Sequence, residues 1–312
     1  MTHFVRQLFT MAIVLAIVSF LAFALMHLVP GDPVLAMVGE DASLERVESM
    51  RRELGFDRPM IVQYGVWLYG AVQGDLGRSV RTGQPITEMV LSRAKPTLQM
   101  ILMGTIFAVI LALPIGILAA ARRNSFWDSL GTTLAMAGLA MPNFWLGILL
   151  MLVFSVWLGW LPALGYVDPF VDLGENMRRM IMPSVALGLG LAAEVLRQTR
   201  SSMLEVLHED YIRTARSYGA SEGRILWHHA LRNAMVPVIT TIGMNMGRLF
   251  GGAVVTEFVF AVPGVGRLVL DSVFARDYPA VQGVVILMSV GVLISYLLVD
   301  IAYTYLDPRV RF

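Results

Sequence analysis

The sequence lacks cysteine and has very little lysine, and each scarcity excludes a kind of chemistry. Its 312 residues include no cysteine and one lysine, Lys95. Without cysteine there are no disulfides, thiolate metal sites or cysteine nucleophiles, and the redox compartment stays undetermined. Because Lys95 follows Ala94, the chain has no P-loop, in which a lysine after glycine reaches the nucleotide phosphates. We therefore expect no ATP hydrolysis by that route.

Charge is also scarce. Charged residues make up 15% of the chain, against about 25% in ordinary soluble domains. The formal net charge is +1 and the basic residues are dispersed, so we expect no nucleic-acid partner. Hydrophobic residues reach 56% with a mean hydropathy of +0.67, and they are gathered into long runs. The composition therefore predicts a protein embedded in a lipid bilayer.

Six apolar runs come close to the roughly 20 residues that cross a bilayer as a helix. The third contains Pro142, so a tilt or kink is expected there, and the fourth is short. The predicted spans are residues 9–29, 97–121, 130–158, 180–196, 234–256 and 281–305.

The positive-inside rule orients these spans. Arg122 and Arg123 lie between the second and third spans, and Arg309 and Arg311 follow the sixth. We place both connections, and therefore both chain termini, in the cytoplasm. The segment 30–96 is then external.

The chain thus divides into an N-terminal transmembrane helix (1–29), an external helical excursion (30–96) and a membrane core (97–312) with a cytoplasmic loop at 197–233. An alternative for the first span is a signal peptide cleaved after Ala22-Phe23-Ala24. The apolar run is longer than a signal peptide needs, and five further spans favour a sixth.

The external excursion has the pattern of two helices. Helix formers over 43–54 end at Gly55, and a second helix opens at Asp57 and Pro59 and ends before Gly74. This second helix either lies at the bilayer interface or on the spans, or offers a docking surface to an external partner.

The loop 197–233 predicts a helix, a sharp turn and a second helix. Glu209 and Arg213 are spaced to form an i,i+4 ion pair, Gly219 suits a helix C′ position, and Ser221 can cap the second helix. The apolar stripe of the first helix comprises Leu204, Leu207, Tyr211, Ala215 and Tyr218.

Several motifs along the chain, above all those in this loop, resemble the motifs of one protein family. They resemble binding-protein-dependent ABC importer permeases of the dipeptide, oligopeptide, nickel and glutathione subfamily, in particular the first of two paired permease subunits. The loop carries EDYIRTARSYG (209–219), HALRNA (229–234) and Pro237. The other motifs are HLVPGDP (27–33), LGFDRP (54–59), GDLGRS (74–79), GWLP (159–162), PGVG (263–266), DYP (277–279) and DPR (307–309).

The resemblance implies an all-α integral membrane protein with six transmembrane helices and a type I ABC importer permease fold. It implies alternating access in a bacterial cytoplasmic membrane, with a second homologous permease, two cytoplasmic ATPases and an external substrate-binding protein. No cofactor and no enzymatic activity are expected in this chain, since ATP and magnesium bind the ATPases. Peptides, glutathione, opine-like conjugates and nickel complexes all remain open as cargo.

By the same resemblance, the first loop helix is the coupling helix that sits in a cleft of the ATPase. Residues 213–215 read Arg-Thr-Ala where the broader signature has Glu-Ala-Ala. An amphipathic helix on the inner leaflet is the alternative. The implied coupling residues are Glu209, Asp210, Tyr211, Arg213, Thr214, Ala215, Arg216 and Gly219.

The fifth span shows two stripes. Gly243, Gly247 and Gly251 are spaced four apart, so they share a face on which another helix can pack closely. Thr241, Asn245 and Arg248 lie roughly opposite those glycines.

An arginine inside a span is unfavourable unless it faces a polar cavity or a paired acid. One hypothesis is that Thr241, Asn245 and Arg248 line the substrate route and that Arg248 favours anionic cargo. The alternative is a structural ion pair between Arg248 and Glu194 or Asp300.

Other functions fit less well. A secondary transporter or channel should show paired acids inside spans, where only Glu194 and Asp300 are candidates. A purely structural scaffold predicts no loss of uptake on deletion. The G-x-S-x-G match at 219–223 lacks the preceding strand that the nucleophile turn of a hydrolase needs, so we expect no hydrolase. His208-Glu209 lacks the second histidine of the H-E-x-x-H zinc motif, so no metal site is expected.

Overall fold

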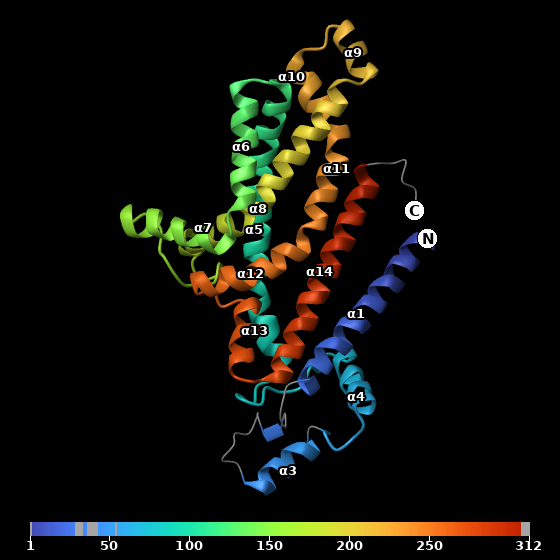
Figure 1. The fold of residues 1–312 in the computed structure, drawn as a ribbon, viewed down its shortest axis with the longest axis vertical. Coiled ribbons are helices and arrows are strands. Elements are labelled where there is room, and N and C mark those ends of the chain that lie inside the picture. The colour runs from blue at the N-terminus through green and yellow to red at the C-terminus, as the bar shows by residue number, and fades with distance from the viewer. Residues whose placement is uncertain (1, 29–33, 36–42, 54, 307–312) are drawn as a thin grey trace. The chain divides into compact units, whose positions relative to one another are not determined.

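The computed structural model describes residues 2–28, 34–35, 43–53 and 55–306 (Figure 1). These residues are almost entirely helical and contain no β-strand; an isolated bridge joins Arg78 and Pro85. The motif residues 29–33, 54 and 307–309 lie outside the described residues. The helices are α1 (Thr2–Leu28), α3 (Leu44–Glu53), α4 (Met60–Val72), α5 (Ile86–Ala121), α6 (Phe126–Ala140), α7 (Asn143–Leu150), η1 (Met151–Trp157), α8 (Leu173–Leu207), α9 (Asp210–Ser217), α10 (Glu222–Arg224), η2 (Ile225–Ala230), α11 (Leu231–Met244), α12 (Met246–Phe260), α13 (Val265–Phe274) and α14 (Tyr278–Leu306).

The chain forms two compact units. The first comprises Met1–Lys95 and Pro263–Leu293, and the second comprises Pro96–Val262 and Ile294–Phe312. The long helices α5 and α14 each contribute to both. Since Pro263–Leu293 folds with the N-terminal segment, the external excursion predicted from the sequence has a partner in the last third of the chain.

Four helices are long and apolar enough to cross a membrane, and two bent helix pairs bring the number to as many as six among the described residues. The prediction of an all-helical membrane protein is confirmed. The single helices are Arg6–Ala24, Ile86–Ala121, Leu173–Leu207 and Tyr278–Val299.

The third predicted span is not one kinked helix. Phe126–Ala140 and Asn143–Trp157 meet at 105°. Met141 is extended, with ψ 126°, because Pro142 disfavours helical backbone in the residue before it. The part after Pro142 has 15 residues and ends in a π-helical turn, too short to cross a bilayer alone.

Two further boundaries differ from the sequence prediction. The fourth span, predicted at 180–196, is part of a 35-residue helix, because α8 continues beyond the apolar run with polar residues on its exposed side. The fifth span bends by 45° between α11 and α12, at Asn245. The even glycine spacing therefore does not run along one straight helix face.

In the first unit, α4 packs against α1. The Tyr64 hydroxyl shares a 2.8 Å hydrogen bond with Ser19 Oγ. The Tyr64 ring lies edge-on to the ring of Phe20. The opposite face of α4 is apolar and exposed, with Ile61 79% and Val72 80% accessible. Both helices of the excursion occur where they were predicted, and Gly55 follows α3 with φ +70°.

Two of the family motifs, far apart in sequence, meet in this unit. The Ser79 hydroxyl donates to the carboxylate of Asp277, which also accepts the Val80 amide at 3.2 Å. Asp277 is 4% exposed. The contact between the GDLGRS turn and the start of α14 is therefore made by a buried carboxylate. The same unit contains a cluster of buried apolar residues: Ile86, Val90, Val265, Leu268, Ala280 and Val284.

In the second unit, α8 is the central helix, packed by α6, α7, α11 and α12. A Cβ added at Gly188 of α8 would lie 2.3 Å from the Gly104 carbonyl oxygen of α5, so only glycine permits this crossing. An ion pair of 2.5 Å between Arg200 and Asp128 fastens α8 to the first turn of α6.

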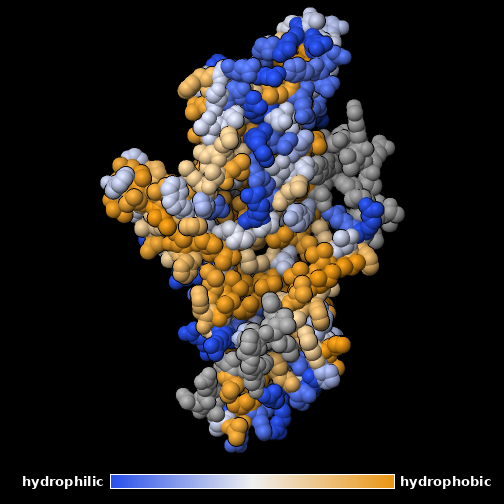
Figure 2. Space-filling view, in the orientation of Figure 1, coloured by the Kyte–Doolittle hydropathy of each residue, from blue (hydrophilic) through white to orange (hydrophobic). Residues whose placement is uncertain are grey.

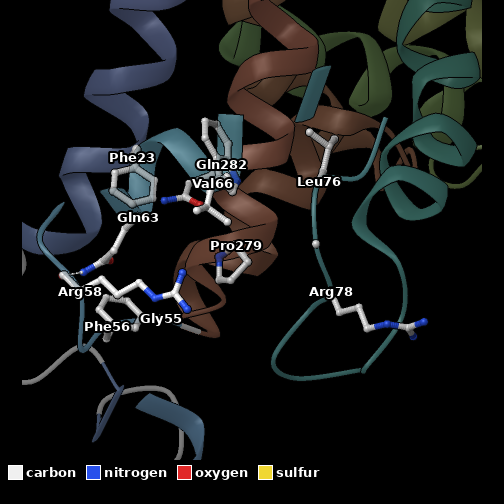
Figure 3. Close-up of a pocket in the computed structure, with 12 residues that line it drawn as sticks. Phe23, Gly55, Phe56, Arg58, Gln63, Val66, Leu76, Arg78, Pro279 and Gln282 are labelled. Atoms are coloured by element: carbon white, nitrogen blue, oxygen red, sulfur yellow. Dashed lines mark hydrogen bonds between the residues drawn. The ribbon is translucent and has the colours of Figure 1, made fainter. Parts of the chain in front are cut away.

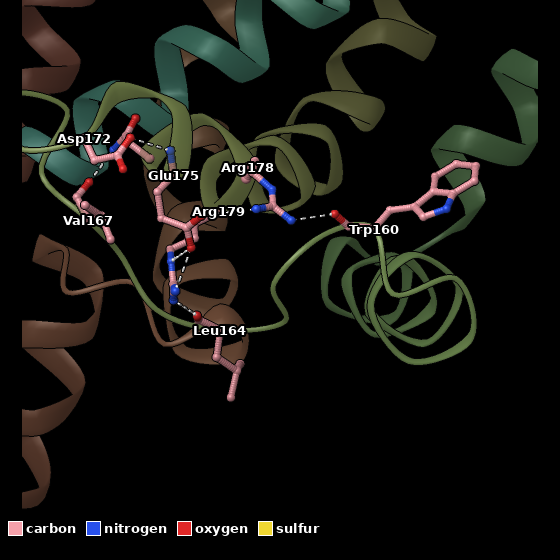
Figure 4. Close-up of polar contacts among 8 residues, drawn as sticks. Trp160, Leu164, Val167, Asp172, Glu175, Arg178 and Arg179 are labelled. Atoms are coloured by element: carbon pink, nitrogen blue, oxygen red, sulfur yellow. Dashed lines mark hydrogen bonds and ion pairs between the residues drawn. The ribbon is translucent and has the colours of Figure 1, made fainter.

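The connection between η1 and α8 is held by side chains from the start of α8 (Figure 4). Arg178 donates to the Trp160 carbonyl at 3.2 Å and Arg179 donates to the Leu164 carbonyl at 2.7 Å. Glu175 accepts from Arg179 at 2.8 Å. These contacts give the connection, which includes the family's GWLP motif, a defined path without regular secondary structure.

Candidate functional site

The loop between α8 and α11 is anchored from beneath by one residue of α9. Ile212 is fully buried and joins a cluster with Ile225 of η2 and Met203 of α8. An eight-residue helix is too short to be stable alone, so this packing is what orders it.

The apolar stripe expected along one helix from Ser201 to Tyr218 is not formed. The chain breaks between Leu207 and Asp210, so two helices occupy this stretch. Ile212, which was not in the predicted stripe, is the buried residue of α9, and Tyr218 is 88% exposed. The break changes the rotational register, and residues spaced by 3.6 across it no longer share a face.

The outer face of α9 is polar and open to solvent. Hydrophilic residues gather over α9 and α10 in the space-filling view (Figure 2). Of the residues that the resemblance implies for coupling, Glu209, Asp210, Tyr211, Arg213, Thr214, Arg216 and Gly219 are exposed and Ala215 is half-buried. The predicted coupling residues therefore lie together on one accessible helix and its two ends.

Two ion pairs shape this face. Arg213 pairs with Asp210 at 3.3 Å, and not with Glu209 as the spacing predicted; Glu209 is the N-cap residue that precedes α9. Arg216 donates two hydrogen bonds to Glu222, at 2.8 and 3.2 Å, across the turn between α9 and α10. These bonds raise the pKa of the Arg216 guanidinium above its usual value, which keeps it charged.

The turn itself depends on Gly219. Its φ is +79°, the left-handed conformation predicted for the residue after a helix, and its amide donates to the Arg216 carbonyl at 2.9 Å. Ser221 stands at the N-cap of α10 but its side chain makes no capping hydrogen bond.

A hydrogen bond that the sequence did not predict ties the loop to the next helix. Asn233 of α11 donates to the Tyr211 hydroxyl at 2.7 Å, and that hydroxyl reaches the His229 carbonyl at 3.4 Å. Tyr211, His229 and Asn233 all belong to the motifs of the loop. Their presence in the same pair of motifs was the one sequence feature that could have indicated this contact. The start of α9 and the start of α11 are therefore mechanically joined.

A polar cluster lies at the bend between α11 and α12. Arg248 forms an ion pair with Glu194 of α8, and Asn245 donates to the same carboxylate at 2.6 Å. Asn245 Oδ1 accepts from Arg248 at 3.0 Å. The Thr241 hydroxyl donates within its own helix, to the Pro237 carbonyl at 3.0 Å, and the Thr241 carbonyl accepts from Asn245 at 2.8 Å.

The arrangement carries no net charge, because Arg248 and Glu194 compensate one another. The Arg248 side chain is nevertheless 68% exposed, whereas that of Glu194 is 16% exposed. The cluster thus combines a nearly buried carboxylate and a buried amide with an accessible guanidinium. The side chain of Asp300, the other acid considered for Arg248, lies outside the described residues.

The three glycines of the fifth span differ in their surroundings. A Cβ at Gly243 would lie 2.5 Å from a Val299 methyl group of α14. Gly247 is half-buried, and Gly251, beyond the bend, is exposed with no atom within 4 Å of an added Cβ. Close helix approach therefore occurs at Gly243 and not at Gly251.

Comparison with known proteins decides the family. Residues 112–312 match the model of the binding-protein-dependent transport system inner membrane component, and residues 1–102 match the model of the N-terminal part of such membrane components. The chain belongs to this family. It is a permease subunit of an ABC importer, and such a subunit works with ATPase partners and a substrate-binding protein.

Similar proteins cover the whole chain. A glutathione transport system permease protein of Escherichia coli O6:H1 is 41% identical over 312 residues, 100% of this chain and 99% of the relative. A putative peptide transport system permease protein of Brucella abortus is 44% identical over 96% of this chain and 95% of the relative. A dipeptide transport system permease protein of Alkalihalophilus pseudofirmus is 37% identical, with 100% of both chains covered.

A solved structure shares the fold. A chain of the MetNI methionine ABC transporter, in inward-facing conformations, superposes with a TM-score of 0.58 and 17% identity. The match covers 70% of this permease and 96% of that chain. The permease thus has an ABC importer permease fold.

Proposed function

We propose that this permease imports peptides, glutathione-like peptides included, into the cytoplasm across the bacterial inner membrane by alternating access. The observation that carries the proposal is the structure of α9. This short helix presents an exposed polar face and is anchored in the second unit through the buried Ile212. The names of the relatives, which refer to glutathione, peptide and dipeptide transport, support peptide cargo.

In this proposal the permease pairs with a second, homologous permease, and two ATPases bind ATP and magnesium in the cytoplasm. An external binding protein delivers the cargo. Both termini and the loop 197–233 face the cytoplasm, and residues 30–96 face outward. The membrane core 97–312 then transmits motion between the two sides.

The coupling role falls on the exposed face of α9. Glu209, Asp210, Tyr211, Arg213, Thr214, Ala215, Arg216 and Gly219 contact the ATPase or shape the contact. ATP binding can reorient the spans only if the docked loop has different geometry in the two states and passes the difference on. The buried Ile212 and the Tyr211–Asn233 hydrogen bond supply that mechanical link to α8 and α11.

A cross-linking experiment tests this role. Because the chain has no cysteine, each engineered thiol is unique. Tyr218→Cys places a thiol at an 88% exposed position beside α9, and Phe274→Cys places a control thiol at a 79% exposed position on α13, outward in this topology. We expect cross-links to the ATPase from Tyr218→Cys only. Equal cross-linking from both, or none from Tyr218→Cys in an assembled importer, would refute the docking.

For the membrane pathway we propose that Asn245 and Arg248, with Thr241 one turn before, border the substrate route, and that Gly243 lets α14 approach behind them. The compensated charge of Arg248 suits zwitterionic peptides better than anions. If Arg248→Ala left uptake of charged and neutral peptides equally unaffected, this assignment would fail.

A further inference from the structure

The first unit contains a small pocket, apart from the coupling loop and the proposed substrate route. It lies between the end of α1, the turn before α4, α4 itself and the start of α14, and its volume is about 180 Å³. Figure 3 shows Phe23, Val66 and Gln282 close together, with the Arg58 side chain extending toward Pro279.

The pocket has hydrogen-bond donors without acceptors. Gln282 is 3% exposed, and its amide nitrogen and the indole nitrogen of Trp67 are buried without a partner. Buried donors of this kind are uncommon because each lost hydrogen bond is unfavourable. Both belong to residues that line the pocket, which makes the pocket a place where an acceptor could pair with them.

The charge of the lining has one sign. It includes Arg58 and Arg78 and no aspartate or glutamate. Arg78 already donates to the Gly83 carbonyl at 3.1 Å, and Figure 3 shows its guanidinium directed away from Arg58. Arg58 is therefore the cation that could pair with an anionic group placed in this pocket.

The level of the pocket in the bilayer favours a lipid headgroup as the source of the anionic group. The α1 span ends at Ala24, one residue after Phe23, and the α14 span begins at Tyr278, four residues before Gln282. The ends of two spans lie where the hydrocarbon gives way to headgroups. Val66, on the pocket rim, is also 58% exposed on the apolar side of α4, next to Val62.

We propose that this pocket binds the phosphate of an anionic phospholipid. Arg58 holds the phosphate by charge-assisted hydrogen bonds, with Trp67 and Gln282 as further donors. A cavity of about 150 Å³ accommodates a benzene ring, so this one has room for a phosphate and its ester arms but not for a whole lipid. The acyl chains then lie outside, along the apolar surface of α1 and α4.

Native mass spectrometry of the assembled importer tests the site. Complexes are released from nanodiscs that contain phosphatidylglycerol and phosphatidylcholine in equal amounts, and retained lipids are counted. Arg58→Gln should lower phosphatidylglycerol retention about tenfold, in line with the loss of a charged hydrogen bond. Arg58→Lys should fall between, and Arg81→Gln, a neighbouring exposed arginine outside the pocket, should match the native complex.

A second arm separates a lipid from a free anion. Inorganic phosphate added during release should not displace phosphatidylglycerol if the acyl chains contribute as inferred. Displacement by millimolar phosphate would mean that the site takes free phosphate, and the lipid proposal would be wrong. Equal retention in Arg58→Gln and Arg81→Gln would overturn the proposal altogether.

Discussion

Gly219 offers a clean test of the coupling loop. Its φ of +79° lies in the region that other L-residues avoid, and no atom lies within 4 Å of an added Cβ. A substitution here therefore acts on the backbone alone. Gly223 of α10 is a matched control, since it too has open space around an added Cβ but no positive φ.

The expected magnitude follows from the conformation. An L-residue in the left-handed region is disfavoured by about 1–2 kcal/mol, a factor of roughly 5–30 in the population of the native turn. Gly219→Ala should therefore reduce ATP-dependent uptake severalfold. Gly219→Asn should retain more activity because asparagine tolerates this conformation, and Gly219→Val should retain least. Gly223→Ala should be neutral or slightly stabilising.

Two assays on reconstituted importer check this. Uptake of labelled peptide gives the functional loss, and hydrogen exchange of the α9 amides gives the change in local order. If Gly219→Ala and Gly223→Ala transported equally and exchanged equally, the rigidity of this turn would not be what couples the loop, and the reasoning would fail.

Three other substitutions probe the packing described above. Arg248→Met should lower the free energy of unfolding by about 1–3 kcal/mol because it leaves the Glu194 carboxylate without its charged partner. Adding Glu194→Gln should restore most of the loss, and failure to do so would exclude a stabilising pair. Gly243→Val should lower the free energy of unfolding by about 1–3 kcal/mol, because the new side chain would clash with Val299. Val299→Ala should relieve that clash in the double variant. If the effects of the two substitutions simply added, the two residues would not be in contact. Asp277→Ala should leave the buried Ser79 hydroxyl and the half-buried Val80 amide without this acceptor and increase protease cleavage of the first unit. Unchanged cleavage would show that the junction does not depend on Asp277.

Much of the fold could be predicted because hydrophobic length is a strong signal. The first, second and sixth spans, and both helices of the excursion, lie close to their predicted places. Gly55 and Gly219 were predicted at helix ends, and both have positive φ. Such features depend on a few neighbouring residues, which a sequence shows directly.

What could not be predicted depends on contacts between distant residues. The register of α9 shifts at a two-residue break that has no glycine or proline, so Ile212 was missed as the anchor. The bend at Asn245 and the pairing of Ser79 with Asp277 likewise need a partner elsewhere in the chain. The partner of Arg248 was narrowed to two acids, and the fold brings Glu194 to it.

The central claim is that separate ATPases drive this permease through its cytoplasmic loop. The most direct measurement is peptide uptake into proteoliposomes that contain both permeases, with the ATPases, binding protein and ATP each present or omitted. We predict uptake only with all components, unaffected when a protonophore collapses the proton gradient. Uptake by the permeases alone that disappeared with the proton gradient would contradict the account.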